Sequence, residues 1–148
     1  IKNNLVSVVL NDIASKIGFL KEKTKDGPAK EWQEKLAIQA NLEDPGKSLS
    51  GGNQQRVVLG KWLASTPDVF VMNCPTVGVD VKSKSEIHIL IRELASQNIA
   101  VLLISDDIGE ILNNSNRVIV MNDGRISYEA ETKDLDYDSL SAKITEII

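Results

Sequence analysis

The stretch that decides the fold is "VFVMNCPTVGVD", which runs from Val69 to Asp80. Its first four residues, through Met72, are all apolar, so they predict a strand that is buried on both faces. A proline and a glycine then predict a turn before the next helix. In α/β nucleotide enzymes such a strand presents acidic residues to a metal at its carboxyl end. Here the strand ends in Asn73 and Cys74, and neither residue is a carboxylate.

The elements expected around this stretch place helices first and alternating strands and helices after them. The first helix has an apolar stripe at four-residue spacing, formed by Leu5, Val9, Ile13 and Ile17. The polar stretch from Lys21 to Pro28 predicts a break, and a second helix follows around Trp32 and Leu36. "NLEDPGKS" predicts a loop, and the elements expected after it are helix Asn53–Ala64, strand Val69–Met72, helix Val81–Ser96, strand Ala100–Ser105, helix Ile108–Leu112, strand Val118–Met121, strand Arg125–Glu129 and a last helix from about Asp138.

Two local patterns sharpen this order. The turn "NDG" at Asn122–Gly124 predicts that the two strands on either side of it form a hairpin. The buried face of the Val81 helix is predicted by the spacing of Ile87, Leu90, Ile91 and Leu94. The order indicates the α/β class, with a small helical subdomain that leads into a partly parallel sheet.

Composition narrows the class of protein. The 148 residues are 42% hydrophobic and 26% charged, as in ordinary soluble domains. The net charge of -4 argues against a nucleic-acid partner, and no segment approaches the roughly 20 apolar residues of a membrane span. The single cysteine excludes an internal disulfide. Because the chain starts at Ile1 and not at Met, we expect a fragment of a longer protein.

The strongest local motif is "SLSGGNQQR", from Ser48 to Arg56. Two glycines directly before a helix, with Ser50 in front of them, suit a phosphate group. The amides at a helix start point outward with the positive end of the dipole, and glycine permits a close approach. The alternative is a serine N-cap with a flexible turn, which is common at helix starts. The residues alone leave both interpretations open.

"LSGGNQQR", followed by a helix, an apolar strand, "PT", Gly-x-Asp, a helix and an "LLIS" strand, resembles the second half of an ABC transporter ATPase domain. The "GGNQQ" form is similar to the C-terminal ATPase domain of tandem ribose/galactose-type sugar importers. The resemblance extends through "NRVIVMNDGRI" and covers nearly the whole chain. It implies a partial P-loop NTPase core with residues 1–48 as the helical subdomain, 49–130 as the signature helix and second half of the core, and 131–148 as a C-terminal helix.

The resemblance also implies roles for individual residues. Ser50, Gly51 and Gly52 would form the signature loop, which contacts the γ-phosphate of ATP bound on the opposing ATPase domain, and Asn53 and Gln54 would complete it. In the next turn, Asp80 would belong to the D-loop, near the opposing nucleotide. The "LLISDD" strand would lead into the switch loop, where the family often has histidine and this chain has Asp106.

The same resemblance makes the end of the Val69–Met72 strand anomalous. In the family this Walker B strand ends in Asp-Glu, which hold Mg²⁺ and position the attacking water. An amide at Asn73 is a poor partner for a hard cation, and a thiol at Cys74 is no substitute for the carboxylate base. Cys74 is interpreted as a small apolar filler, and His88 as a solvated or half-buried helix residue. The Gly-Lys-Ser at Gly46 is no P-loop, since position 41 lacks the required glycine.

The function implied is that of an ATP-binding fragment of an importer of a simple sugar, with ATP and Mg bound largely by residues outside this chain. The implied partners are the other ATPase domain, the transmembrane permease subunits and, indirectly, a sugar-binding protein, at the cytoplasmic face of the membrane. Residues from Lys21 to Trp32 are expected near the membrane subunits. Alone, the chain is expected not to hydrolyse ATP.

Two alternatives from other classes stay open. One is a soluble ABC-type protein that acts on ribosomes or DNA, against which the lack of basic clusters and of coiled-coil heptads counts. The other is a catalytically inactive interaction module in which the signature loop is a relic.

Overall fold

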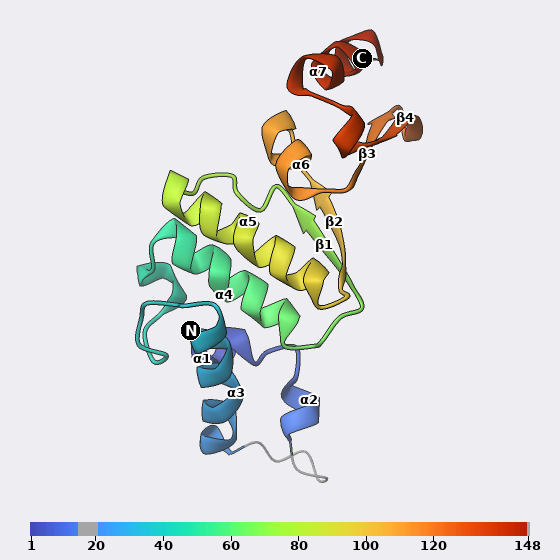
Figure 1. Cartoon of the computed structure of the whole chain (residues 1–148). Coiled ribbons are helices and arrows are strands. Elements are labelled where there is room, and N and C mark those ends of the chain that lie inside the picture. Colours follow the sequence, from blue (N-terminus) through green and yellow to red (C-terminus); the bar gives the residue numbers. More distant parts are fainter. Residues whose placement is uncertain (15–20, 148) are drawn as a thin grey trace. The chain divides into compact units, whose positions relative to one another are not determined.

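A computed structural model describes residues 1–14 and 21–147 (Figure 1). The chain forms two compact units. The helical unit comprises the described residues of Ile1–Asp68 together with Thr76–Ile87, and the strand unit comprises those of Val69–Pro75 and His88–Ile148. No helix in the described ranges is long and apolar enough to cross a membrane. The three-segment division expected from the sequence, at residues 48 and 130, stays a prediction.

The helical unit packs three helices against one another. Its elements are α1 (Lys2–Leu5), α2 (Leu10–Ile13), α3 (Glu22–Lys35), a 3₁₀ turn (Gly46–Ser48), α4 (Gly51–Leu63) and the first part of α5 (Val81–Ser96). Helices α1, α3 and α4 contact each other in pairs. A methyl group on Gly60 of α4 would lie 2.7 Å from Cδ1 of Leu36 and 2.9 Å from Cδ2 of Leu5, so glycine permits this close crossing.

The first expected helix is wrong as a continuous element. The chain forms α1 and α2 as separate short helices, and Val6 ends the first. The intervening stretch contains β-branched valines, which disfavour helix, and the hydroxyl of Ser7 donates to the carbonyl of Asn4 at 2.9 Å. Leu5 and Val9 of the predicted stripe are buried and Ile13 is half-buried. Ile17 lies outside the described residues.

The expected break from Lys21 to Pro28 is also wrong, because α3 begins at Glu22 and contains Pro28. Ion pairs stabilise its charged first turns. Lys25 pairs with Glu22 at 2.7 Å within the helix, and Lys2 of α1 lies 3.1 Å from the carboxylate of Asp26. Packing of the next turn adds to this, since Ala29 is fully buried. Tertiary contacts therefore override the local signal of a polar stretch that ends in proline.

The strand unit contains a parallel pair and an antiparallel hairpin. Strand β1 (Val69–Asn73) pairs in parallel with β2 (Ala100–Ile104), and β3 (Arg117–Asn122) pairs with β4 (Arg125–Glu131). The other elements are the second part of α5, α6 (Ile108–Asn114), a 3₁₀ turn (Thr132–Asp134) and α7 (Tyr137–Ile147). Asp123 and Gly124 both have positive φ, which confirms the predicted tight hairpin turn. Helix α5 has the predicted bounds, and Ile87, Ile91 and Leu94 of its predicted face are buried.

The expectation that β1 is buried on both faces is wrong. Phe70 and Met72 are 6% and 3% exposed, whereas Val69 and Val71, on the other face, are 61% and 58% exposed. On β2, Leu102 pairs with Val71 and is likewise exposed. Within the described chain only one face of this parallel pair is covered. An apolar run does not tell by itself how many faces of a strand are covered.

Candidate functional site

The motif at Ser50 forms a corner of the helical unit, where the chain enters α4. Ser50 is the N-cap of this helix, and its hydroxyl accepts from the backbone N–H of Asn53 at 3.4 Å and from the Asn53 side chain at 3.2 Å. The side chain of Gln54 donates back to the carbonyl of Leu49 at 2.9 Å. The predicted N-cap is confirmed. A capping role does not exclude a ligand, because Ser50 and Gly51 are exposed.

The two glycines bring α4 against the turn that precedes α5. A methyl group on Gly51 would lie 3.3 Å from the carbonyl oxygen of Gly78. One on Gly52 would overlap Ser83, at 2.2 Å from its Oγ, and would lie 3.9 Å from Oδ2 of Asp80. The structure therefore brings the predicted signature and D-loop residues together within one unit, and only glycine fits at position 52 without displacement of Ser83.

Asp80 is the cap of α5 in this arrangement. Its Oδ1 accepts from the backbone N–H of Ser83 at 3.0 Å, and its Oδ2 accepts from the Ser83 hydroxyl at 2.7 Å. These two hydrogen bonds, the backbone one first, hold the pKa of the Asp80 carboxyl below its ordinary value. Asp80 is exposed and charged, and its carboxylate stabilises the positive end of the α5 dipole. An aspartate directly before the first residue of a helix is a sequence signal that could have identified this cap.

Polar contacts with the end of α3 and with α5 hold the start of α4 in place. The side chain of Asn53 accepts from the backbone N–H of Gln39 at 3.2 Å. One turn later, Arg56 donates to the carbonyls of Leu36 and Ala37 at 3.0 and 2.9 Å, and it forms an ion pair with Glu86 of α5. The start of α4 is thus fixed to the end of α3 and to the start of α5. Sequence reasoning did not identify the roles of Arg56 and Glu86.

The corner fits a phosphate group. Helix α4 has 13 residues, and in any helix the first amides lack intrahelical acceptors. The absence of a side chain at Gly51 leaves the backbone accessible, and the Ser50 hydroxyl lies beside it. This corner can therefore bind an oxyanion of a ligand through backbone amides and one hydroxyl.

The carboxyl end of β1, in the strand unit, has a different chemistry. Asn73 pairs with Ile104 of β2, which places the end of β1 at the same sheet edge as Asp106. Cys74 is half-buried with φ 48°, and its N–H donates to the carbonyl of Ile104 at 2.8 Å. Across the described ranges, no group of three or more His, Cys, Asp and Glu residues gathers in a geometry for a metal ion. The residues at this end do not fit a magnesium site.

A buried carboxylate near Asp106 was missed by the sequence reasoning. Glu110 contacts His88 and Ser105 within the strand unit. His88 is half-buried on α5, as predicted, but its partner lies 22 residues away in the sequence. No local pattern signals such a pair.

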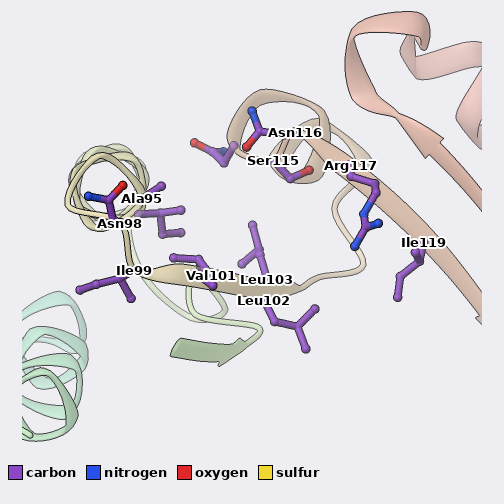
Figure 2. Close-up of a pocket in the computed structure, with 13 residues that line it drawn as sticks. Ala95, Asn98, Ile99, Val101, Leu102, Leu103, Ser115, Asn116, Arg117 and Ile119 are labelled. Atoms are coloured by element: carbon purple, nitrogen blue, oxygen red, sulfur yellow. The ribbon is translucent and has the colours of Figure 1, made fainter. Parts of the chain in front are cut away.

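A groove in the strand unit was also not foreseen. It has a volume of about 490 Å³ and lies along β2, between the end of α5 and the segment that leads into β3. Figure 2 shows the β2 side chains Val101 and Leu103, with Ser115, Asn116 and Arg117 across the groove. None of the predicted site residues lines it. In the described structure β2 pairs with β1 along one of its edges, and the groove lies beside the other edge of β2.

Proteins of known function are similar in sequence to this chain over most of its length. No family model matches the chain. The ribose import ATP-binding protein RbsA of Streptococcus agalactiae is 40% identical over 141 residues, which are 95% of this chain and 28% of the relative. A ribose/galactose/methyl galactoside import ATP-binding protein of Rhizobium meliloti is 40% identical over 128 residues, 86% of this chain and 25% of the relative. The chain thus spans about a quarter of the length of these relatives.

Solved structures match over a larger share of their own chains. A nucleotide-free ATP-binding cassette from an ABC transporter has a TM-score of 0.80 and 25% identity, over 99% of this chain and 61% of that chain. A dimeric ATP-binding cassette in a post-hydrolysis state, bound to ADP and Pi, has a TM-score of 0.70 and 25% identity, over 87% of this chain and 56% of that chain.

Proposed function

Because the chain belongs to the ABC transporter ATPase family, we propose that it is part of the ATP-binding subunit of a sugar importer and supplies a signature loop to an ATP site. The other residues of that site come from a second ATPase domain. The similarity to ribose and ribose/galactose import proteins supports a simple sugar as the transported substrate. It favours transport over an ABC-type protein that acts on ribosomes or DNA.

The observation that carries this proposal is the corner at the start of α4. Gly51 and Gly52 pack directly against the turn that contains Gly78 and against the cap formed by Asp80 and Ser83. A phosphate that approaches the first amides of α4 therefore also approaches the segment proposed as the D-loop. The Ser50 hydroxyl can donate to such a phosphate while its oxygen still caps the helix. The proposed ligand contacts at this corner are the Ser50 hydroxyl, the backbone amides of Gly51 and Gly52, and the side chains of Asn53 and Gln54, since the amides of these last two residues donate to Ser50.

We also propose that ATP is hydrolysed at a site whose catalytic residues lie outside this chain, and the residues at the end of β1 support this. When ATP and Mg²⁺ bind at an ABC site, metal coordination and activation of water require carboxylates, and Asn73 and Cys74 supply none. Asp106 is an exposed carboxylate at this sheet edge, but a single acid does not replace the missing pair. The isolated chain is therefore expected to be inactive as an ATPase.

The bare face of the parallel pair supports the placement of this chain within a larger ATPase domain. Parallel sheets are ordinarily covered on both faces, yet Val69, Val71 and Leu102 are exposed here. The groove along β2 leaves the second edge of this strand accessible as well. We therefore expect further chain of the same ATPase domain to cover this face. The permease subunits, the sugar-binding protein and a location at the cytoplasmic face of the membrane follow from the proposed transport function, as does a contact of the Trp32 region with the permease.

The experiment that tests this assignment measures ATP hydrolysis by the longer importer subunit. We expect the double substitution Asn73→Ala and Cys74→Ala to leave the rate within about twofold, because these side chains contribute no catalytic group. As a matched control, alanine at the two corresponding Walker B positions of the other ATPase domain should reduce the rate by about a hundredfold or more. A loss of tenfold or more in the Asn73 and Cys74 variant would show that this chain's own site hydrolyses ATP.

A further inference from the structure

Glu110 is the buried charged residue of the described chain. Its exposed fraction is 2%, whereas the other acidic residues near it, Asp106 and Asp107, are exposed. Burial of a carboxylate is unfavourable unless hydrogen-bond partners replace the lost water. Glu110 lies on the first turn of α6, a helix of seven residues that directly follows the loop after β2. Its position is therefore set by specific partners and not by the general packing of apolar groups.

Both carboxylate oxygens of Glu110 have a partner from a different element. Oε1 lies 2.8 Å from Nε2 of His88 on α5, and Oε2 accepts from the hydroxyl of Ser105 at 2.5 Å. When Glu110 is ionised it only accepts hydrogen bonds, so Nε2 of His88 must be the donor. A second link joins the same two helices, because Arg92 donates to Asn114 at 2.6 Å and Asn114 donates to the carbonyl of Glu110 at 2.8 Å.

The loop between β2 and α6 is held by the same group of residues. The oxygen of Ser105 accepts from the backbone N–H of Asp107 at 3.1 Å. Asp107 in turn caps α6, with its Oδ1 accepting from the N–H of Glu110 at 3.0 Å. Asp106 lies between these two anchored residues and is itself exposed. The result is a short loop with both flanks fixed and its central carboxylate presented to solvent.

We infer that Glu110 is a positioning residue, which ties the loop Ser105–Asp107 to helix α5 through His88 and so fixes where the Asp106 carboxylate points. This loop is the proposed switch loop, but the inference rests on the contacts of the strand unit alone. The two links to α5, through His88 and through Arg92, lie four residues apart and therefore on one face of that helix. The loop that carries Asp106 is thereby linked to the part of α5 that lies in the strand unit.

The test is amide hydrogen exchange on this chain, with the variants Glu110→Ala and Glu110→Gln. In the alanine variant the amide of Asp107 should exchange about tenfold faster, because Ser105 loses the partner that orients its hydroxyl. The amides of the β1–β2 pair should change by less than about threefold. Glutamine retains an acceptor and should restore the Asp107 rate to within about threefold of the parent chain. Glu93→Ala, which removes an exposed carboxylate from α5, is the matched control and should change neither set of amides.

The single histidine of the chain supplies a second readout. In the parent chain the Nε2 proton of His88 should be protected from exchange with solvent, and Glu110→Ala should abolish this protection. A separate variant, His88→Ala, removes the partner that holds Oε1 of Glu110, so the carboxylate orients Ser105 less firmly and exchange at Asp107 should again be faster. It keeps the inference testable where Glu110→Ala does not fold.

Three outcomes would overturn the inference. One is an Asp107 rate that stays unchanged in both Glu110→Ala and His88→Ala. Another is an acceleration that is equal at Asp107 and at the strand amides, which would make Glu110 a general stabilising residue. The third is a failure of glutamine to restore the rate. None of these outcomes depends on a signature loop or on ATP, so they are distinct from a failure of the proposed function.

Discussion

The start of α4 and the end of β1 are the two regions in which we propose nucleotide-site residues, and they differ in the chemical groups that they offer to a nucleotide. At the start of α4 the relevant groups belong mainly to the backbone, and Gly51 and Gly52 leave that backbone accessible. At the end of β1 the relevant groups would be side chains, and we propose that Asn73 and Cys74 stand there in place of carboxylates. The pairing of β1 is nevertheless intact, since Asn73 still faces Ile104.

On the proposed assignment of the two regions, the two kinds of site are lost in different ways. A metal-binding end of a strand loses its chemistry when two side chains change, while the strand itself still pairs. A phosphate site made of backbone amides depends on the close approach of two segments and on the lack of a side chain at Gly51. Gly52 is in contact with Ser83, so the corner cannot drift without a cost to the fold. The corner is therefore maintained by packing, whether or not it binds a ligand.

The largest expected effect on stability comes from Gly52→Ala. The new methyl group would lie 2.2 Å from Oγ of Ser83, and we expect the free energy of unfolding to fall by about 2–3 kcal/mol. Urea denaturation of this chain measures it. Gly27→Ala in α3 is the matched control, because nothing lies within 4 Å of the added methyl, and it should stabilise by about 0.5–1 kcal/mol. If both alanine variants changed the free energy of unfolding by equal, small amounts, close packing at Gly52 would not hold the corner in place.

A smaller effect distinguishes Ser50 from Asn73. Ser50→Ala removes the cap of α4 and should lower the free energy of unfolding by about 1 kcal/mol, whereas Ser50→Thr should retain most of it. Asn73→Ala changes an exposed side chain and should stay within about 0.5 kcal/mol. The same denaturation measurement compares the three variants. If Asn73→Ala lowered the free energy of unfolding more than Ser50→Ala does, Asn73 would stabilise the fold through contacts that the structure does not show.

The smallest effect concerns Asp80 and appears only in its dependence on pH. The pKa of Asp80 is lowered in the folded chain, so its contribution to stability is present above the ordinary value of 3.8 and is lost as pH falls through the folded pKa. Asp80→Asn can still cap α5 but cannot titrate, so it should flatten the decline in unfolding free energy below about pH 4.

Asp136→Asn is the matched variant for this titration. Asp136 accepts from the backbone N–H of Ser139 at 2.8 Å, and its pKa is lowered for the same reason as that of Asp80. Denaturation between about pH 2 and 7 should therefore show a similar flattening for both variants. If the unfolding free energy of Asp80→Asn declined at low pH as steeply as that of the parent chain, the Asp80 cap of α5 would not form in solution.

The sequence predicted the elements that local patterns determine. Helix α5 has the expected bounds, and β1, β2 and the hairpin differ by one or two residues at their ends. Features that depend on distant partners were not predictable. The helix through Pro28 depends on Lys2, the burial of Glu110 depends on His88, and the exposure of Val71 depends on what covers the sheet. At the candidate site, Ser50 and the glycines were identified from the motif, but their contact with Ser83 required the structure.

The central claim is that the corner at Gly51 completes an ATP site whose catalytic acids lie in another domain. The most direct measurement is the ATP hydrolysis rate of the longer importer subunit with Gly51→Asp and Gly51→Asn, two side chains of equal size of which only the first is charged. A carboxylate at the phosphate site should reduce the rate by about a hundredfold, and considerably more than the neutral amide does. A rate within about threefold of the parent protein in the aspartate variant, with folding intact, would contradict the claim.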